Sequence, residues 1–96
     1  MRRTNTEEIS GLMQRYIKAY RLEQPLGRAR IINNWSEIVG AMIANNTDEL
    51  NIVNRKLYVK LKSSIVRHEL MMIKTPLIER LNEVAGVKVI DDIIFQ

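Results

Sequence analysis

The chain has 96 residues, a length that suits one small domain over residues 1–96, and its formal net charge is +4. It has no cysteine, which excludes disulfides and thiolate metal sites. No apolar run approaches the roughly 20 residues that a membrane span needs, and the N-terminus lacks an apolar signal core. We therefore expect a soluble, cytoplasmic protein that makes no membrane contact, and the excess of basic residues favours acidic partners such as nucleic acid.

The N-terminal part of the sequence predicts a first helix that ends near Leu22. Residues 1–5 are polar, and we expect them to be disordered; Asn5 and Glu8 have the spacing of a capping box at the helix start. One face of this helix is apolar and is expected to pack on the domain. It carries Ile9, Leu12, Met13, Tyr16, Ile17 and Tyr20.

A second helix is predicted from about Leu26 to Ala44, after Gln24–Pro25 breaks the first. Its apolar arc is formed by Ile31, Ile32, Trp35, Ile38, Val39, Met42 and Ile43. Trp35 is either an exposed anchor for a partner or a core residue, and its place within the arc favours the core. Gly40 lowers helix propensity and indicates a close backbone contact or a kink.

A β-hairpin follows, because apolar and polar residues alternate on both sides of a possible turn at Asn54-Arg55. With that two-residue turn, Ile52 faces Leu57, Leu50 faces Val59, and Glu49 faces Lys60. Arginine is not ideal at the second turn position, so a longer loop is the alternative. Leu57, Val59 and Leu61 then face the core, while Tyr58, Lys60 and Lys62 face solvent.

The apolar period changes from two to about 3.6 at Ser63-Ser64, which predicts an N-cap and a helix from Ile65 to about Ala85. Pro76 falls in the middle of this helix, on the side away from its apolar stripe. Gly86 is placed to cap the C-terminal end. Met71 and Met72 lie beside the stripe and either fill gaps in the core or form an adaptable contact surface.

Residues 87–95 predict a last strand, interrupted at Asp91-Asp92. The resulting order is α-α-β-β-α-β, which indicates the α+β class and a two-layer sandwich with helices on one face of a three-stranded sheet. A right-handed crossover through the third helix sets the last strand parallel to the second strand of the hairpin, in a mixed sheet.

Six residues are candidates for nucleic-acid binding. Lys56, Tyr58, Lys60 and Lys62 form a strip in which a base could stack on the tyrosine and phosphates could meet the lysines. The alternative is an ordinary solvated sheet face, on which lysine guards against aggregation. Arg28 and Arg30 open the predicted second helix, where positive charge is unfavourable against the helix dipole. They are therefore either functional residues or ordinary surface residues.

No constellation of residues points to catalysis. The sequence has no nucleophilic cysteine, no Gly-rich loop that would cradle phosphates, and no Ser–His–Asp order at meaningful spacing. We therefore expect neither enzymatic activity nor a cofactor, a bound metal or a small-molecule substrate.

Short segments along residues 20–95 resemble the DciA family of bacterial proteins by their order and spacing. They are Trp35-Ser36-Glu37-Ile38-Val39-Gly40, Ile43-Ala44, Asn46-Thr47, Leu57-Tyr58-Val59, Ser63-Ser64, Glu69-Leu70, Leu81-Asn82, Gly86 and Ile93-Ile94-Phe95. The resemblance implies a KH-like fold and a role in DNA replication, as a loader of the DnaB-type replicative helicase with affinity for single-stranded DNA.

The chain departs from the family pattern in two respects. Many members have a large aromatic residue where this chain has Val66, and many carry a long basic extension that contributes DNA binding. We expect a minimal, domain-only member. The chain also lacks the Gly-x-x-Gly loop with which KH domains clamp a nucleic-acid backbone.

Two functions therefore remain open. The first is an adaptor of replication that contacts the helicase and binds single-stranded DNA or RNA weakly. The second is a pure protein–protein interaction module, with an RNA-binding KH-like module as a further alternative.

Overall fold

The computed structural model describes residues 2–96, with side chains described from residue 10 onward. The expected capping box of Asn5 and Glu8 lies outside the described side chains. The elements in chain order are α1 (Arg2–Ala19), α2 (Glu23–Asn33), α3 (Trp35–Val39), α4 (Ala41–Asn45), β1 (Thr47–Val53), β2 (Lys56–Leu61), α5 (Ser64–Met72), α6 (Lys74–Ala85) and β3 (Asp92–Phe95).

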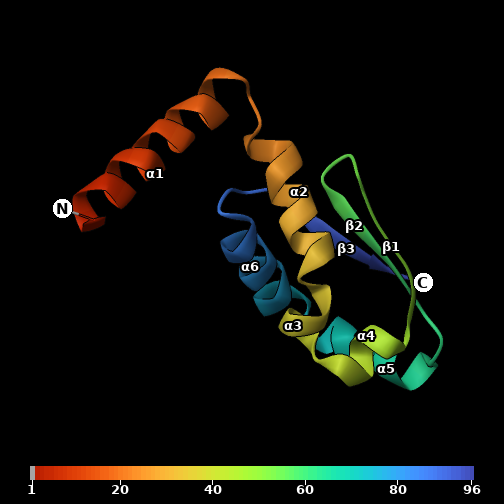
Figure 1. Cartoon of the computed structure of the whole chain (residues 1–96). Coiled ribbons are helices and arrows are strands. Elements are labelled where there is room, and N and C mark those ends of the chain that lie inside the picture. The colour runs from red at the N-terminus through yellow and green to blue at the C-terminus, as the bar shows by residue number, and fades with distance from the viewer. Residues whose placement is uncertain (1) are drawn as a thin grey trace.

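The three strands form one mixed sheet in the order β1-β2-β3, with helices packed on one face (Figure 1). β1 and β2 are antiparallel, and β2 and β3 are parallel. The predicted α+β class, the helical layer on one face and the parallel placement of the last strand are all confirmed. Because β2 is the central strand, its side chains point either into the core beneath the helices or outward on the open face of the sheet.

The predicted hairpin register is confirmed in every pair. Ile52 lies opposite Leu57, Leu50 opposite Val59, and Glu49 opposite Lys60. The turn residues Asn54 and Arg55 have φ angles of 51° and 66°. Positive φ at both central positions is the geometry of the two-residue type I′ turn, whose twist matches that of the strands.

The predicted third helix is wrong in one respect, because it is two helices, α5 and α6, that meet at Ile73. Ser63 caps α5 as expected, since its hydroxyl accepts a hydrogen bond from the Val66 amide at 3.3 Å. Pro76 causes the break: it has no N–H to donate to the carbonyl of Met72, and its ring clashes with that turn. In α6 it occupies the first turn, where an N–H would have no partner in any case.

The predicted second helix is also interrupted, and it forms α2, α3 and α4. Gly40 separates α3 from α4 with φ 92° and ψ 159°, a region that glycine alone adopts readily. The expectation of a kink there is confirmed. Between α2 and α3, the Arg30 carbonyl accepts from both the backbone N–H and the side-chain amide of Asn34, at 3.0 and 2.7 Å.

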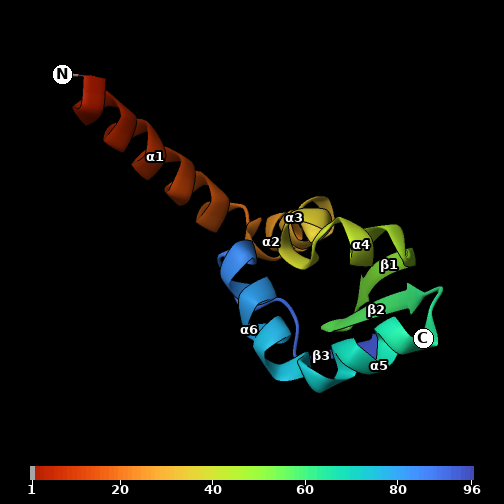
Figure 2. The same cartoon turned by 90° about the horizontal axis from the view of Figure 1, so that it is seen from below.

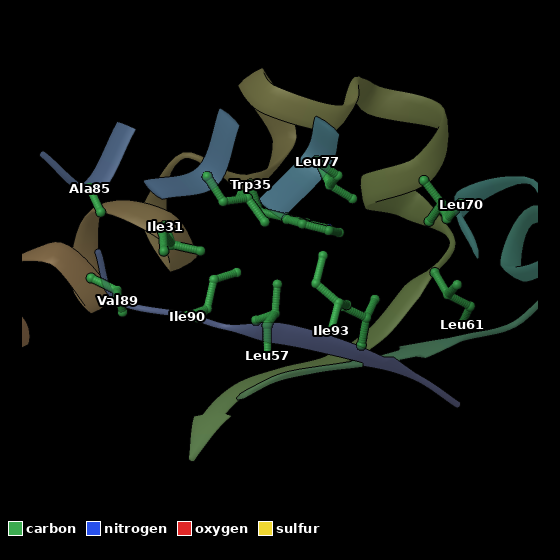
Figure 3. Packing of buried hydrophobic residues seen from close by; sticks show 12 residues of the cluster. Ile31, Trp35, Leu57, Leu61, Leu70, Leu77, Ala85, Val89, Ile90 and Ile93 are labelled. Atoms are coloured by element: carbon green, nitrogen blue, oxygen red, sulfur yellow. The ribbon is translucent and has the colours of Figure 1, made fainter. Parts of the chain in front are cut away.

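The core lies between the inner face of the sheet and the helices (Figure 3). Leu57, Val59 and Leu61 of β2 are buried in it, as the alternation predicted. Trp35 is only 5% exposed, which confirms its place in the core. Its indole N–H donates to the Thr47 hydroxyl at 3.0 Å, so the polar end of the ring is satisfied where α3 meets the start of β1.

The last strand is shorter than predicted. Strand β3 begins at Asp92, and residues 87–91 form a loop whose side chains at Val89 and Ile90 point into the core. The Asn82 side chain holds this loop on α6: its oxygen accepts from the Val89 and Ile90 amides at 2.9 and 3.1 Å, and its nitrogen donates to the Ile90 carbonyl at 3.0 Å. The loop can therefore bury apolar residues without pairing to the sheet.

Helix α1 does not pack on the sheet, contrary to expectation, and projects from the domain (Figures 1 and 2). Three residues of its apolar face, at positions 12, 13 and 16, are more than half exposed, as is Tyr20 directly after its end. Arg21, with φ 55°, turns the chain between α1 and α2. Among the described residues, no helix combines the length and the apolar character that a membrane span requires.

A close approach at Gly27 of α2 generates a prediction about stability. A Cβ atom at this position would lie 2.6 Å from Cγ2 of Val89 and 3.2 Å from Cγ1 of Val87. Gly27→Ala should therefore lower the free energy of unfolding by about 1–3 kcal/mol, the usual effect of overpacking, as measured by urea denaturation. The control is Gly11→Ala in α1, where the added methyl meets open space and should not destabilise the domain.

Candidate nucleic-acid interface

The outer face of the sheet carries Lys56, Tyr58 and Lys60 of the central strand. Both lysines are exposed and Tyr58 is half-buried, as the alternation of β2 predicted. Tyr58 lies opposite Asn51 on one side and Ile94 on the other. The face therefore offers one aromatic ring between two positively charged side chains, the arrangement of a single stacking platform beside phosphate-attracting groups.

A carboxylate accompanies each lysine of the strip. Glu49 lies directly opposite Lys60 on β1, and Asp92 lies opposite Lys56 on β3. Lys62 follows the end of β2, and its Nζ is 3.8 Å from a carboxylate oxygen of Asp48. Charges of opposite sign across neighbouring strands attract one another, so these carboxylates reduce the positive potential of the strip. Asp92 also forms an ion pair with Lys74 at 3.1 Å.

The structure separates Arg28 and Arg30 from the strip, because α2 belongs to the helical layer. The argument that they oppose the helix dipole is wrong, since α2 begins at Glu23 and Arg30 lies in its last turn. Arg30 instead donates from Nη1 to the Ala85 carbonyl at 2.8 Å, at the C-terminal end of α6. Positive charge is favourable there. Arg28 is exposed on α2.

Gly86 caps the same end of α6, as predicted, in the left-handed conformation with φ 80°. A Cβ atom at Gly86 would lie 3.3 Å from Nη1 of Arg30. The glycine therefore leaves room for the guanidinium to reach the carbonyl at the helix end. Arg30 has a structural role that the sequence did not reveal, because the bond joins residues 55 positions apart.

Asp91 and Asp92, where an interruption of the strand was expected, form ion pairs that attach the start of β3 to the rest of the domain. Arg55 donates from Nε and Nη2 to the two carboxylate oxygens of Asp91, at 3.0 and 3.1 Å. This hydrogen bond is the main cause that lowers the pKa of Asp91. The Ile93 amide, followed by Lys74, lowers the pKa of Asp92. Both carboxylates have cationic partners in the described residues, and these partners join the hairpin turn and α6 to the start of β3.

A second surface of note lies at the break between α5 and α6. Met71 and Met72 are 54% and 75% exposed, so the interpretation that they fill the core is wrong. Ile73 follows them and is also exposed, and Ile65 is exposed two turns earlier on α5. Exposed apolar residues gathered at one place indicate a contact site for a partner, and methionine adapts its shape to different partners. The sequence signal was the run of apolar residues 71–73 shortly before Pro76.

Sequence reasoning missed a shallow hollow beside the edge strand β1. It has a volume of about 350 Å³, and its lining combines apolar side chains with acidic ones. It is lined by Ile32, Asn33, Trp35, Ser36, Ala44, Thr47, Asp48, Glu49 and Leu50. Among the side chains that the structure describes, no three His, Cys, Asp or Glu residues come together as metal ligands.

Comparison with known proteins gives one family. No curated protein matches the chain. A family model described as Dna[CI] antecedent, DciA, matches residues 8–95, which is nearly the whole chain. The match includes the core, the outer face of the sheet and the break between α5 and α6. The chain therefore belongs to the DciA family.

Proposed function

We propose that this protein is a non-enzymatic adaptor of DNA replication that loads the replicative helicase of the DnaB type and binds single-stranded nucleic acid weakly. Membership of the DciA family carries the helicase-loading part of the proposal. The family match extends from residue 8 to residue 95, so the described domain itself is the element to which the role is assigned.

Weak nucleic-acid binding is proposed for the outer face of the sheet. Tyr58 supplies a ring on which one base can stack, and Lys56 and Lys60 flank it. The opposing carboxylates of Glu49 and Asp92 limit the attraction for phosphate. Arg28 and Lys62 can add contacts at a distance from the ring, whereas Arg30 is engaged at the end of α6. A small number of phosphate contacts gives weak, sequence-tolerant binding.

Helicase contact is proposed for the helical layer, at the exposed apolar residues around Met72. Met71, Met72 and Ile73 lie next to one another at the end of α5, and Ile65 lies two turns earlier on the same helix. This surface is separate from Tyr58, which is on the opposite side of the sheet. An adaptor with this layout can hold a protein partner and a nucleic-acid strand at the same time.

The second candidate function is a protein–protein interaction module alone. The acidic residue beside each strip lysine favours it, because nearby negative charge reduces the attraction of the lysines for phosphates. We also propose that the domain is KH-like, from its order of helices and strands. Backbone clamping by a Gly-x-x-Gly loop forms no part of the proposal, since the sequence contains no such loop.

Salt dependence of oligonucleotide binding tests the nucleic-acid proposal. The affinity for a strand of about 30 nucleotides should be micromolar or weaker near physiological salt, with a log–log salt slope of about −2 to −4. Replacing Lys60 and Lys62 together with serine should flatten the slope by about one to two units. The matched control replaces Arg80 and Lys88 with serine, which removes the same charge from exposed positions outside the strip. Absence of binding at about 50 mM salt leaves the protein–protein module as the function.

The carboxylate opposite Lys60 should restrain nucleic-acid binding. Glu49→Gln removes the negative charge with little change in shape, and we expect single-stranded DNA to bind roughly 2- to 5-fold more tightly at low salt. Glu79→Gln on α6 is the control, with the same change in charge on the helical layer. Fluorescence anisotropy measures both. Equal affinities of the two variants would show that the strand binds elsewhere.

Substitution of Met72 tests the proposed helicase contact. Because its side chain is 75% exposed, Met72→Glu should leave thermal stability unchanged. It should reduce capture of the replicative helicase from the same organism by about tenfold, which is typical of charging the centre of an apolar contact. Ala29→Glu, at an exposed position of α2, is the control. Capture that is reduced equally by both variants, or by neither, would contradict this placement of the contact.

A further inference from the structure

Strand β1 is an edge of the sheet, and one row of its backbone groups has no strand beside it. The order β1-β2-β3 leaves β1 with β2 as its single neighbouring strand among the described residues. On β2, the Val59 carbonyl accepts from the Gln96 amide, and the Leu61 amide donates to the Gln96 carbonyl. Val59 and Leu61 therefore turn their backbone groups toward β3 and not toward β1.

Leu50 and Ile52 are the residues of β1 whose backbone groups point away from the sheet. Leu50 lies opposite Val59, which bonds to β3, so the two residues form a non-bonded pair of the antiparallel ladder. Such pairs alternate with bonded ones, so Asn51 bonds to β2 and Ile52 faces outward again. No backbone group outside the sheet is hydrogen-bonded to either residue in the described chain. The edge thus offers two amides and two carbonyls in one row.

The shallow hollow of about 350 Å³ lies at the same edge, along the first half of β1. Its apolar lining includes Ile32 and Trp35 of the helical layer and Leu50 of the edge itself. Its charged lining is acidic, from Asp48 and Glu49, and no lysine or arginine of the described chain lines it. A side chain with an apolar stem and a cationic head matches this lining, because the stem can lie on apolar surface while the head meets a carboxylate.

The two carboxylates keep the capacity to bind a further cation. A carboxylate oxygen of Asp48 is 3.8 Å from Nζ of Lys62, and the two side chains are 43% and 61% exposed. An exposed pair at this separation is weak. Glu49 lies opposite Lys60 in the ladder, at the open face of the sheet. A cation that enters the hollow therefore meets negative charge that its neighbours hold only loosely.

We propose that the β1 edge binds an extended peptide segment of a partner protein, which adds a strand to the sheet and places a lysine or arginine in the hollow. Hydrogen bonds to Leu50 and Ile52 supply affinity, and the hollow selects the side chain. In an added antiparallel strand, the residue opposite Leu50 points to the helical side as Leu50 does, because directly opposite residues share a face. That residue is the one that reaches the hollow.

The charges at the edge select this occupant. A nucleic-acid strand would bring its phosphates to Asp48 and Glu49, which repel them. A second copy paired edge to edge would not supply the cation from its own strand, since β1 has the sequence TDELNIV. Helix α1 leaves the domain on the side away from β1 in both views, so it does not cover the edge (Figures 1 and 2). The site shares neither Tyr58 nor Met72, so the proposal does not depend on the proposed helicase contact.

Binding of a capped seven-residue peptide, in which lysine alternates with valine, tests the proposal. The full chain carries a net charge of +4 and repels this peptide overall, so binding reports a local acidic site. We expect a dissociation constant of roughly 10–500 µM by isothermal titration at low salt. N-methylation of every peptide amide should weaken binding by about tenfold or more, because it removes the donors. Absence of binding, or equal binding of the methylated peptide or of one with glutamate in place of lysine, overturns the proposal.

Neutralising the hollow tests the choice of side chain. Asp48→Asn combined with Glu49→Gln removes both charges with little change in shape, and it should weaken binding of the lysine peptide roughly 3- to 10-fold. The matched control combines Glu79→Gln with Glu83→Gln, which makes the same change in charge on α6 and should leave the affinity unchanged. Circular dichroism verifies that both variants are folded. Equal affinities of the two variants overturn the proposal.

Amide hydrogen exchange, followed by NMR, locates the added strand on the natural chain. Without peptide, the amides of Leu50 and Ile52 should exchange faster than that of Asn51, which is bonded to β2. Saturating lysine peptide should slow exchange at Leu50 and Ile52 by about fivefold or more. Unchanged exchange at both residues overturns the proposal even where the peptide binds. Slowing that grows with protein concentration in the absence of peptide assigns the edge to a second copy and also overturns it.

Discussion

The burial of Leu57, Val59 and Leu61 is the constraint on which the rest of the structure depends. These residues belong to the central strand, which is paired on both edges, and they are between 0 and 7% exposed. Successive side chains of a strand point to opposite faces, so their burial sends Lys56, Tyr58 and Lys60 outward. A slip by one residue would exchange the two faces and place two lysines in the core.

Covering a short twisted sheet from one side requires a helical layer that bends. The sequence has two long stretches with the apolar periodicity of a helix, and each would form a straight helix without an interruption. Gly40 divides the first stretch and Pro76 divides the second. The breaks let short helices follow the sheet and bring Trp35, Leu70 and Leu77 onto the same core. They also have a consequence for the surface, since the division at Ile73 leaves apolar residues at the end of α5 exposed.

Surface charge changes the balance between the possible functions. A basic composition suggests an extended nucleic-acid surface, yet the sheet brings Asp48, Glu49 and Asp92 next to the lysines of the strip. Apolar surface, in contrast, is exposed in two separate places, on α1 and at the end of α5. This arrangement supports the proposal that the domain acts mainly through protein contacts and binds nucleic acid weakly on the open face of its sheet.

The sequence by itself determined the features that depend on neighbouring residues. Strand alternation, the hairpin register at Asn54-Arg55 and the caps at Ser63 and Gly86 are local, because turn geometry and side-chain period act over a few residues. Only the tertiary structure decided that α1 leaves the domain, that Arg30 bonds to the end of α6, and that Asp92 lies opposite Lys56. These features join segments far apart in the chain, and their energies depend on distances that no local pattern contains.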